Sequence, residues 1–191
     1  MPVNLQKGQR VNLLKEDGGV LRRVIVGLGW DKSVRRGAPP IDCDASAILC
    51  GANGKITCRE DTVYFGNLKH PSHAVQHTGD NLTGDGDGDD EQILVNLSEM
   101  PAQYEKIIFT VNIYQAKERN QHFGMIQNAF IRIVDAENRK EMLRYRLSEN
   151  YDGMTALIFG EIYRKEGLWK FNALGHPTQD ARLSALVARY S

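Results

Sequence analysis

The sequence predicts a mainly β protein, an antiparallel sandwich or barrel with few helices. Short segments rich in Val, Ile, Phe and Thr recur along the 191 residues, as is usual for strands. Turn signals separate these segments, such as Asn53-Gly54 and Lys165-Glu166-Gly167. Strands at this density joined by turn residues favour a sandwich or a barrel. The length favours a single domain covering residues 1–191.

The expected elements follow one another with little space between them. Strands are predicted at residues 11–14, 21–28, 45–50, 55–58, 62–65, 92–97, 106–114, 130–134, 141–147, 155–164 and 168–174. Ser98 is placed to cap a short helix over residues 98–104, and residues 116–121 could form one helical turn. A final helix is expected within residues 177–190, where apolar side chains share one helical face: Leu183, Leu186, Val187 and Tyr190.

The composition excludes several classes of protein. Lys and Arg number 24 and so do Asp and Glu, and no basic run could follow a phosphate backbone, so nucleic acid is not an expected partner. The N-terminus carries no apolar signal segment, and no run of eighteen apolar residues is present. The three cysteines have no CxxC spacing and are expected to be reduced. These features predict a soluble cytoplasmic protein that does not insert into a membrane.

Residues 79–91 form an unusually acidic and glycine-rich stretch. They contain six carboxylates and no Lys or Arg. Two carboxylates about 6 Å apart repel each other by roughly 3 kcal/mol at an effective dielectric constant near 20. The stretch is therefore either a solvated linker or a loop closed by a divalent ion, and its flexible set of oxygen ligands suits Ca²⁺ best. It is not an EF-hand, because the sixth and twelfth positions counted from Asp85 hold Asp90 and Asn96.

Further acidic residues lie at expected strand ends. Asp42 and Asp44 place two carboxylates on one face of a strand, because strand side chains alternate. Asp31 follows Gly27-Leu28-Gly29-Trp30, which lacks the third glycine and the helix of a dinucleotide fingerprint. The same acids could hold Mg²⁺ in a phosphoryl-transfer or nucleotide-processing enzyme, which is the alternative function.

Two other sets of side chains carry reactive groups, the histidines and the cysteines. His70, His73 and His77 have a spacing that could serve a transition metal, although scattered loop histidines are the preferred interpretation. Of the three cysteines, Cys43, Cys50 and Cys58, Cys43 lies between two acids, whose negative charges would raise the pKa of its thiol and make it a poor nucleophile. No nucleophile or general base has an evident partner, so no catalytic residue and no enzymatic activity are predicted.

Several motifs are spread over nearly the whole chain. They are Gly27-Leu28-Gly29-Trp30-Asp31, Asp42-Cys43-Asp44-Ala45-Ser46, the stretch from His77 to Gln92, Asn128-Ala129-Phe130-Ile131-Arg132, Leu147-Ser148-Glu149, Phe159-Gly160-Glu161-Ile162-Tyr163-Arg164 and Trp169-Lys170-Phe171. Together these motifs closely resemble the TerD family of tellurite-resistance and stress proteins. The chain departs from the family pattern at Cys43, where Leu is usual, and at Asp85, where Glu is frequent.

The resemblance implies a β-sandwich of two antiparallel sheets with short helices and a site for two Ca²⁺ ions between loops. The implied partners are other stress and tellurite-resistance proteins, reached at the inner face of the membrane through a partner. The carboxylate ligands that it implies are Asp31, Asp42, Asp44, Asp80, Asp85, Asp87, Asp89, Asp90 and Glu91. The implied backbone contacts are the carbonyls of Leu28, Asn81 and Thr83.

Overall fold

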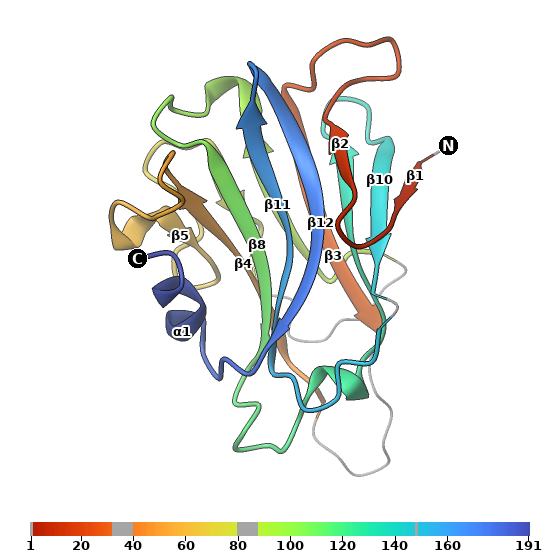
Figure 1. Ribbon diagram of the computed structural model, residues 1–191, viewed down its shortest axis with the longest axis vertical. Helices are drawn as coiled ribbons and strands as arrows, with labels where there is room; N and C mark the ends of the chain where they lie inside the picture. Colours follow the sequence, from red (N-terminus) through yellow and green to blue (C-terminus); the bar gives the residue numbers. More distant parts are fainter. Residues whose placement is uncertain (1, 32–39, 80–87, 148) are drawn as a thin grey trace.

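Strands dominate the computed structural model, which describes residues 2–31, 40–79, 88–147 and 149–191 (Figure 1). The strands are β1 Val3–Leu5, β2 Arg10–Asn12, β3 Arg23–Asp31, β4 Cys43–Cys50, β5 Thr62–Val63, β6 Val75–His77, β7 Glu91–Asn96, β8 Lys106–Ile113, β9 Gln127–Asp135, β10 Glu141–Arg146, β11 Ala156–Lys165 and β12 Leu168–Thr178. The helical elements are the 3₁₀ turns η1 Arg59–Asp61, η2 Leu97–Glu99 and η3 Phe123–Met125, and the helix α1 Leu183–Ala188.

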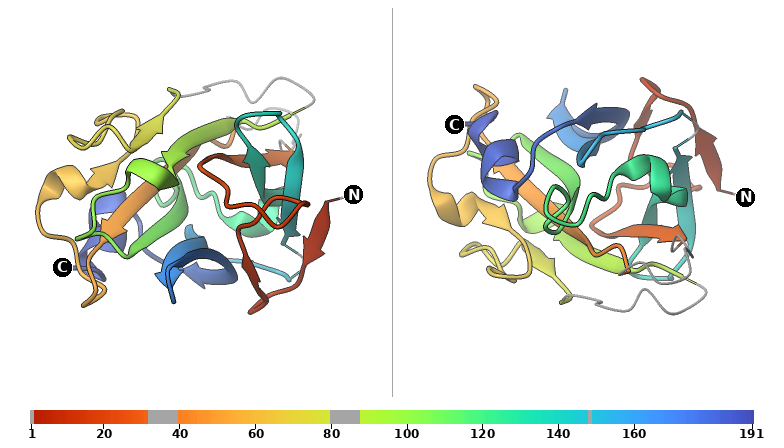
Figure 2. Two further views of the ribbon diagram at one scale, coloured as in Figure 1. Left: turned by 90° about the horizontal axis from the view of Figure 1, so that it is seen from above. Right: turned by 90° about the horizontal axis from the view of Figure 1, so that it is seen from below.

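Two six-stranded sheets face each other, so the chain forms a β-sandwich, as predicted (Figure 2). Sheet A has the order β1-β10-β9-β3-β7-β6, and sheet B has the order β2-β12-β11-β8-β4-β5. The pairings between named strands are antiparallel except that β1 lies parallel to β10 at the edge of sheet A. The parallel edge strand had no counterpart in the predicted pattern, which begins at residue 11.

The main core lies between the two sheets, and β4 shows how the sequence fills it. Cys43, Ala45, Ala47 and Leu49 belong to this core. The intervening side chains point to the outer face of sheet B, because strand residues alternate. The whole of β4 is nevertheless buried, which requires that something covers the outer face.

The cover is the C-terminal helix α1. Leu186 is fully buried and joins Ile48, Cys50, Ile108 and Ile158 of sheet B in a second apolar cluster. Figure 2 shows α1 outside the sandwich, against sheet B. The helix is shorter than the predicted range 177–190, because β12 continues to Thr178 and pairs there with β11.

Three sequence predictions were wrong in type. Residues 55–58 were expected to be a strand, but after the turn at Gly54 the chain bends into η1. Residues 98–104 were expected to be a helix and contain only the end of η2. Strand β6 lies in a polar stretch predicted to be a loop, and it pairs with β7.

The hairpin between β11 and β12 follows the prediction closely. Glu166 and Gly167 have φ values of 55° and 77°, so both central residues adopt the left-handed conformation of a two-residue hairpin turn.

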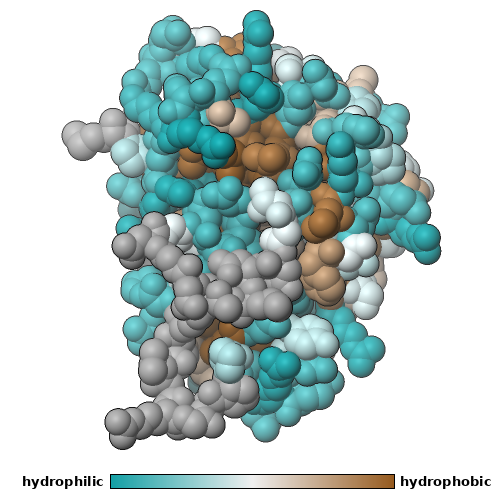
Figure 3. All heavy atoms as spheres, turned by 180° about the vertical axis from the view of Figure 1, so that it is seen from behind, coloured by the Kyte–Doolittle hydropathy of each residue, from teal (hydrophilic) through white to brown (hydrophobic). Residues whose placement is uncertain are grey.

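Viewed from behind, the surface is mostly hydrophilic with small separate apolar patches (Figure 3). Within the described ranges, no helix is long and apolar enough to cross a membrane.

Candidate functional site

The start of β7 is fastened to both sheets by its acidic residues. The Asp90 backbone N–H donates to the Leu28 carbonyl at 2.8 Å, and the Asp90 carboxylate accepts the Trp30 backbone N–H at 2.7 Å. The neighbouring Glu91 carboxylate accepts the Ala45 backbone N–H at 2.5 Å. The first two bonds hold β3 of sheet A and the third holds β4 of sheet B, so the end of the acidic stretch ties the sheets together.

Glu91 has a second partner, His77 of β6. The distance between His77 Nε2 and Glu91 Oε2 is 3.2 Å, and the two residues are 1% and 2% exposed. The other ring nitrogen, Nδ1, accepts the Gly79 backbone N–H, so the neutral ring carries its proton on Nε2 and donates to Glu91. His77 therefore contacts Glu91, whereas His70 contacts a different carboxylate, that of Asp61.

Asp89 forms a two-bond ion pair with Arg132 of β9. Arg132 Nε and Nη2 donate to the two carboxylate oxygens at 2.6 Å and 3.0 Å, and Gln92 adds a bond of 3.0 Å. The Asp89 side chain is completely buried, and its carboxylate raises the pKa of Arg132. Arg132 also contacts Glu141 at 2.9 Å. Asp89 therefore anchors the end of the acidic stretch to the outer face of sheet A.

This contact explains why β3 carries the sequence Gly27-Leu28-Gly29. A Cβ atom on Gly27 would lie 2.1 Å from Asp89 Oδ2, and one on Gly29 would lie 2.4 Å from the Phe130 ring. Neither approach is possible for a residue with a side chain. The glycines give room to Asp89 and Phe130, a role that the sequence alone could not show.

The remaining acids of the predicted site that the structure describes lie at the start of β4 and the end of β3. Asp31 is exposed and accepts a hydrogen bond of 2.5 Å from Asn128 Nδ2. Asp42 is half-buried just before β4. Asp44 is 6% exposed and lies opposite Asn112 of β8 on the outer face of sheet B.

Four of these carboxylates are close enough to Cys43 to affect its ionisation. Burial raises the pKa of the Cys43 thiol, and nearby carboxylates raise it further: Asp44, Asp42, Glu91 and Asp90. The local environment is thus negative and rich in oxygen atoms, which fits a hard cation such as Ca²⁺.

The other predicted ligands lie outside the described residues: the carboxylates of Asp80, Asp85 and Asp87 and the backbone positions Asn81 and Thr83. Within the described ranges, no group of three or more His, Cys, Asp or Glu could hold a metal.

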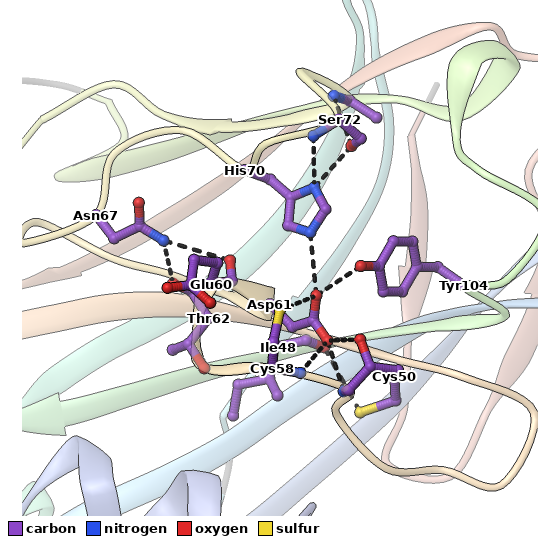
Figure 4. Close-up of polar contacts among 12 residues, drawn as sticks. Ile48, Cys50, Cys58, Glu60, Asp61, Thr62, Asn67, His70, Ser72 and Tyr104 are labelled. Atoms are coloured by element: carbon purple, nitrogen blue, oxygen red, sulfur yellow. Dashed lines mark hydrogen bonds and ion pairs between the residues drawn. The ribbon is translucent and has the colours of Figure 1, made fainter.

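A buried polar network around Asp61 was not anticipated from the sequence (Figure 4). One oxygen of Asp61 accepts from the Tyr104 hydroxyl at 2.6 Å and lies 3.2 Å from His70 Nε2. The other accepts from the N–H and hydroxyl of Thr57 and from the Cys58 N–H. Burial alone would raise the pKa of Asp61, but the bonds from Tyr104, Thr57 and His70 outweigh it and hold the pKa well below its usual range.

The network includes a hydrogen-bonded Ser-His-Asp line whose histidine and aspartate are buried. Ser72 Oγ lies 2.7 Å from His70 Nδ1, and the same ring nitrogen accepts the Ser72 backbone N–H at 3.1 Å. Ser72 Oγ also accepts the Ala74 N–H at 3.2 Å. Asp61 and His70 are 0% and 3% exposed, so a substrate could not reach them. The network fastens residues 57–61 to residues 70–74.

The comparison with known proteins agrees with the motifs of this site. A family model described as the TerD domain matches residues 1–190. The chain belongs to the TerD family. It is similar to Stress response protein SCP2 of Bacillus subtilis (strain 168), with 51% identity over the full length of both chains. It is also 45% identical to Tellurium resistance protein TerD of Serratia marcescens, over 100% of this chain and 97% of that protein.

A solved structure supports the TerD fold independently. A homologue of telluride resistance protein (TerD) from Streptomyces coelicolor A3(2) superimposes with a TM-score of 0.69 and 23% identity, covering 90% of this chain and 98% of that chain. At this identity the likeness concerns the fold. The fold and the family predicted from the sequence are thus both confirmed.

Proposed function

We propose that this protein binds Ca²⁺ through its acidic stretch and serves the tellurite-resistance and stress response of its family through contacts with partner proteins. The observation that carries the proposal is the convergence of β3, β4 and β7, held by Asp90 and Glu91. These bonds place the base of the acidic stretch between the strand ends that carry Asp31 and Asp42. A stretch so fastened at its base needs a counter-charge to hold its remaining carboxylates together.

The described contacts divide the predicted ligands into two groups. Both carboxylate oxygens of Asp89 accept hydrogen bonds from Arg132, and we assign Asp89 a positioning role. Asp90 and Glu91 hold the strands together through backbone N–H groups. We propose that the ions, two by family resemblance, are held chiefly by Asp31, Asp42, Asp80, Asp85 and Asp87, with backbone oxygens completing their coordination.

Thermal unfolding with and without Ca²⁺ tests the proposal. An ion present at a hundredfold excess over its Kd stabilises the native state by about 2.7 kcal/mol. For a domain of this size, that raises Tm by about 5–10 °C. Asp42→Ala and Asp87→Ala should reduce the rise, whereas Glu99→Gln, at an exposed acid of η2, should leave it intact. A Tm indifferent to Ca²⁺ and to chelator would overturn the proposal.

The alternative is a Mg²⁺-dependent phosphoryl-transfer or nucleotide-processing enzyme that uses the same acids. A panel of generic phosphatase and nucleotidase substrates with Mg²⁺ or Mn²⁺ separates the two functions. We expect no turnover above that of the Asp42→Ala variant. Metal-dependent turnover lost in that variant would favour the enzyme.

We further infer that the protein acts in the cytoplasm, and that the partners are other stress and tellurite-resistance proteins, met at the inner face of the membrane through one of them. Ion binding would reshape the surface formed by the acidic stretch, so the association should depend on Ca²⁺. Co-purification with tagged proteins of the same resistance system, in Ca²⁺ and in EDTA, tests this. Equal recovery in both conditions would contradict a metal-dependent contact.

A further inference from the structure

A pocket of about 340 Å³ opens on the outer face of sheet B, beside the start of α1. Its size is within the range of small-molecule sites. The side chains that define it come from β4, from β8, from the residues directly after β5 and β8, and from the N-cap of α1: Asp44, Asn112, Tyr64, Phe65, Tyr114 and Arg182. We call this the Asp44 pocket. It is not part of the Ca²⁺ site proposed above.

The floor of the Asp44 pocket presents hydrogen-bond acceptors. Asp44 and Asn112 lie opposite each other in the register of β4 and β8, and each is 6% exposed. Asn112 Oδ1 is buried and has no hydrogen-bond partner among the described residues. A buried acceptor without a donor is costly, so such groups usually mark a missing partner. The missing partner would be a donor that enters the pocket.

The charge of the pocket favours a cation. Two of its lining residues are acids, Asp44 on the floor and Glu118 at the rim. Among the described lining residues, Arg182 is the one base and is exposed, whereas Asp44 is buried. A cation at the floor would therefore meet a buried carboxylate, where attraction is stronger than at the surface.

The walls of the pocket are aromatic and partly uncovered. Phe65 and Tyr114 are 46% and 41% exposed, and the Tyr64 ring packs edge-on against Phe65 at 5.3 Å. Aromatic faces attract cations, and Arg119 already lies 5.2 Å from the centre of the Tyr114 ring. Such walls suit a flat apolar body attached to a positively charged nitrogen group.

We propose that the Asp44 pocket binds a small organic cation of the amidinium or guanidinium class. Its N–H groups donate to the Asp44 carboxylate and to Asn112 Oδ1, and its body lies among Tyr64, Phe65 and Tyr114. This assigns Asp44, which the family resemblance counts among the calcium ligands, to a separate site. The two sites can therefore be occupied at the same time.

Three probes of one shape test the proposal: benzamidine, benzamide and benzoate, which carry a positive, a neutral and a negative group on the same ring. Their binding to the full chain is measured by NMR titration, in Ca²⁺ and again in EDTA. Benzamidine should bind at least about tenfold more tightly than benzamide, and benzoate should not bind. The shifts should centre on Asn112 and Tyr114.

Variants locate the interaction. Asp44→Asn should weaken benzamidine binding by about tenfold and leave benzamide unchanged, and Glu99→Gln is the matched control. If Asp44→Asn does not fold, Tyr114→Ala removes an exposed wall and should also weaken binding. Equal binding of the three probes, or shifts elsewhere on the surface, would overturn the proposal. So would displacement of benzamidine by Ca²⁺, which would return Asp44 to the calcium site and leave the proposed function intact.

Discussion

Replacing Gly27 with Ala should destabilise the protein by displacing Asp89. The new Cβ would lie 2.1 Å from Asp89 Oδ2 and 2.3 Å from Asp89 Cγ, far inside van der Waals contact. The carboxylate cannot simply swing away, because it is buried and held by both Arg132 and Gln92. Breaking a buried charge pair costs about 3–5 kcal/mol. Since Arg132 keeps Glu141 as a partner, we expect the lower end, about 3 kcal/mol.

Urea unfolding in EDTA measures this cost without any contribution from metal. In thermal unfolding, the same loss of about 3 kcal/mol would lower Tm by about 6–12 °C for a domain of this size. Gly88→Ala is the matched control, because a Cβ there would meet nothing within 4 Å. Gly88 is also next to Asp89 in the sequence, so the control preserves the location.

A double-mutant cycle makes the reasoning refutable. In an Asp89→Ala background the obstructing carboxylate is gone, so Gly27→Ala should cost about 1 kcal/mol or less. If Gly27→Ala is harmless in the native background, the steric argument is wrong. If it costs the same in both backgrounds, the loss arises elsewhere and Asp89 is not its cause.

Three further predictions concern other parts of the molecule. Asp61→Asn should lower the free energy of unfolding by about 3 kcal/mol or more. The pKa of Asp61 is lowered in the folded state. The ionised Asp61 therefore stabilises the folded protein fully above about pH 4, and this stabilisation is lost as the pH falls further. Urea unfolding between pH 2 and pH 7 should therefore show a shallower pH dependence in Asp61→Asn than in the native protein, and equal slopes would contradict the assignment. Leu186→Ala should cost about 2–4 kcal/mol by exposing the outer face of sheet B, which chemical unfolding measures, and a change below about 1 kcal/mol would show that α1 is not a necessary cover. A thiol reagent should modify the native protein at Cys58, since Cys43 and Cys50 are buried, and rapid modification of Cys58→Ser would refute this.

The sequence predicted the strands with strong alternation or dense β-branched residues, such as β8 and β11, because their pattern arises from burial on the sheet. It failed where long-range contacts decide the local structure. Residues 55–58 alternate between polar and apolar side chains, which is why a strand was expected. The N–H groups of Thr57 and Cys58 instead donate to the Asp61 carboxylate, so they do not pair with a neighbouring strand. β6 is too short for a periodic pattern and exists because β7 offers it an edge.

The candidate site shows the same limit. The sequence predicted that the acidic stretch and the acids at two strand ends belong to one site. The structure places Asp90 and Glu91 at the strand ends near Asp31 and Asp42. The pairing of Asp89 with Arg132 spans 43 positions, so no local spacing could reveal it. The Asp61 network contains a contact between residues 43 positions apart, so the local sequence could not reveal it either.

The central claim is that the acidic stretch exists to hold calcium, and counting bound ions tests it most directly. Equilibrium dialysis of the purified protein against Ca²⁺, with the bound metal determined by atomic spectroscopy, gives the number of ions per chain. We predict two ions in the native protein, fewer in Asp42→Ala and Asp87→Ala, and no change in Glu99→Gln. A native protein that retains no Ca²⁺ at millimolar free ion would contradict the account.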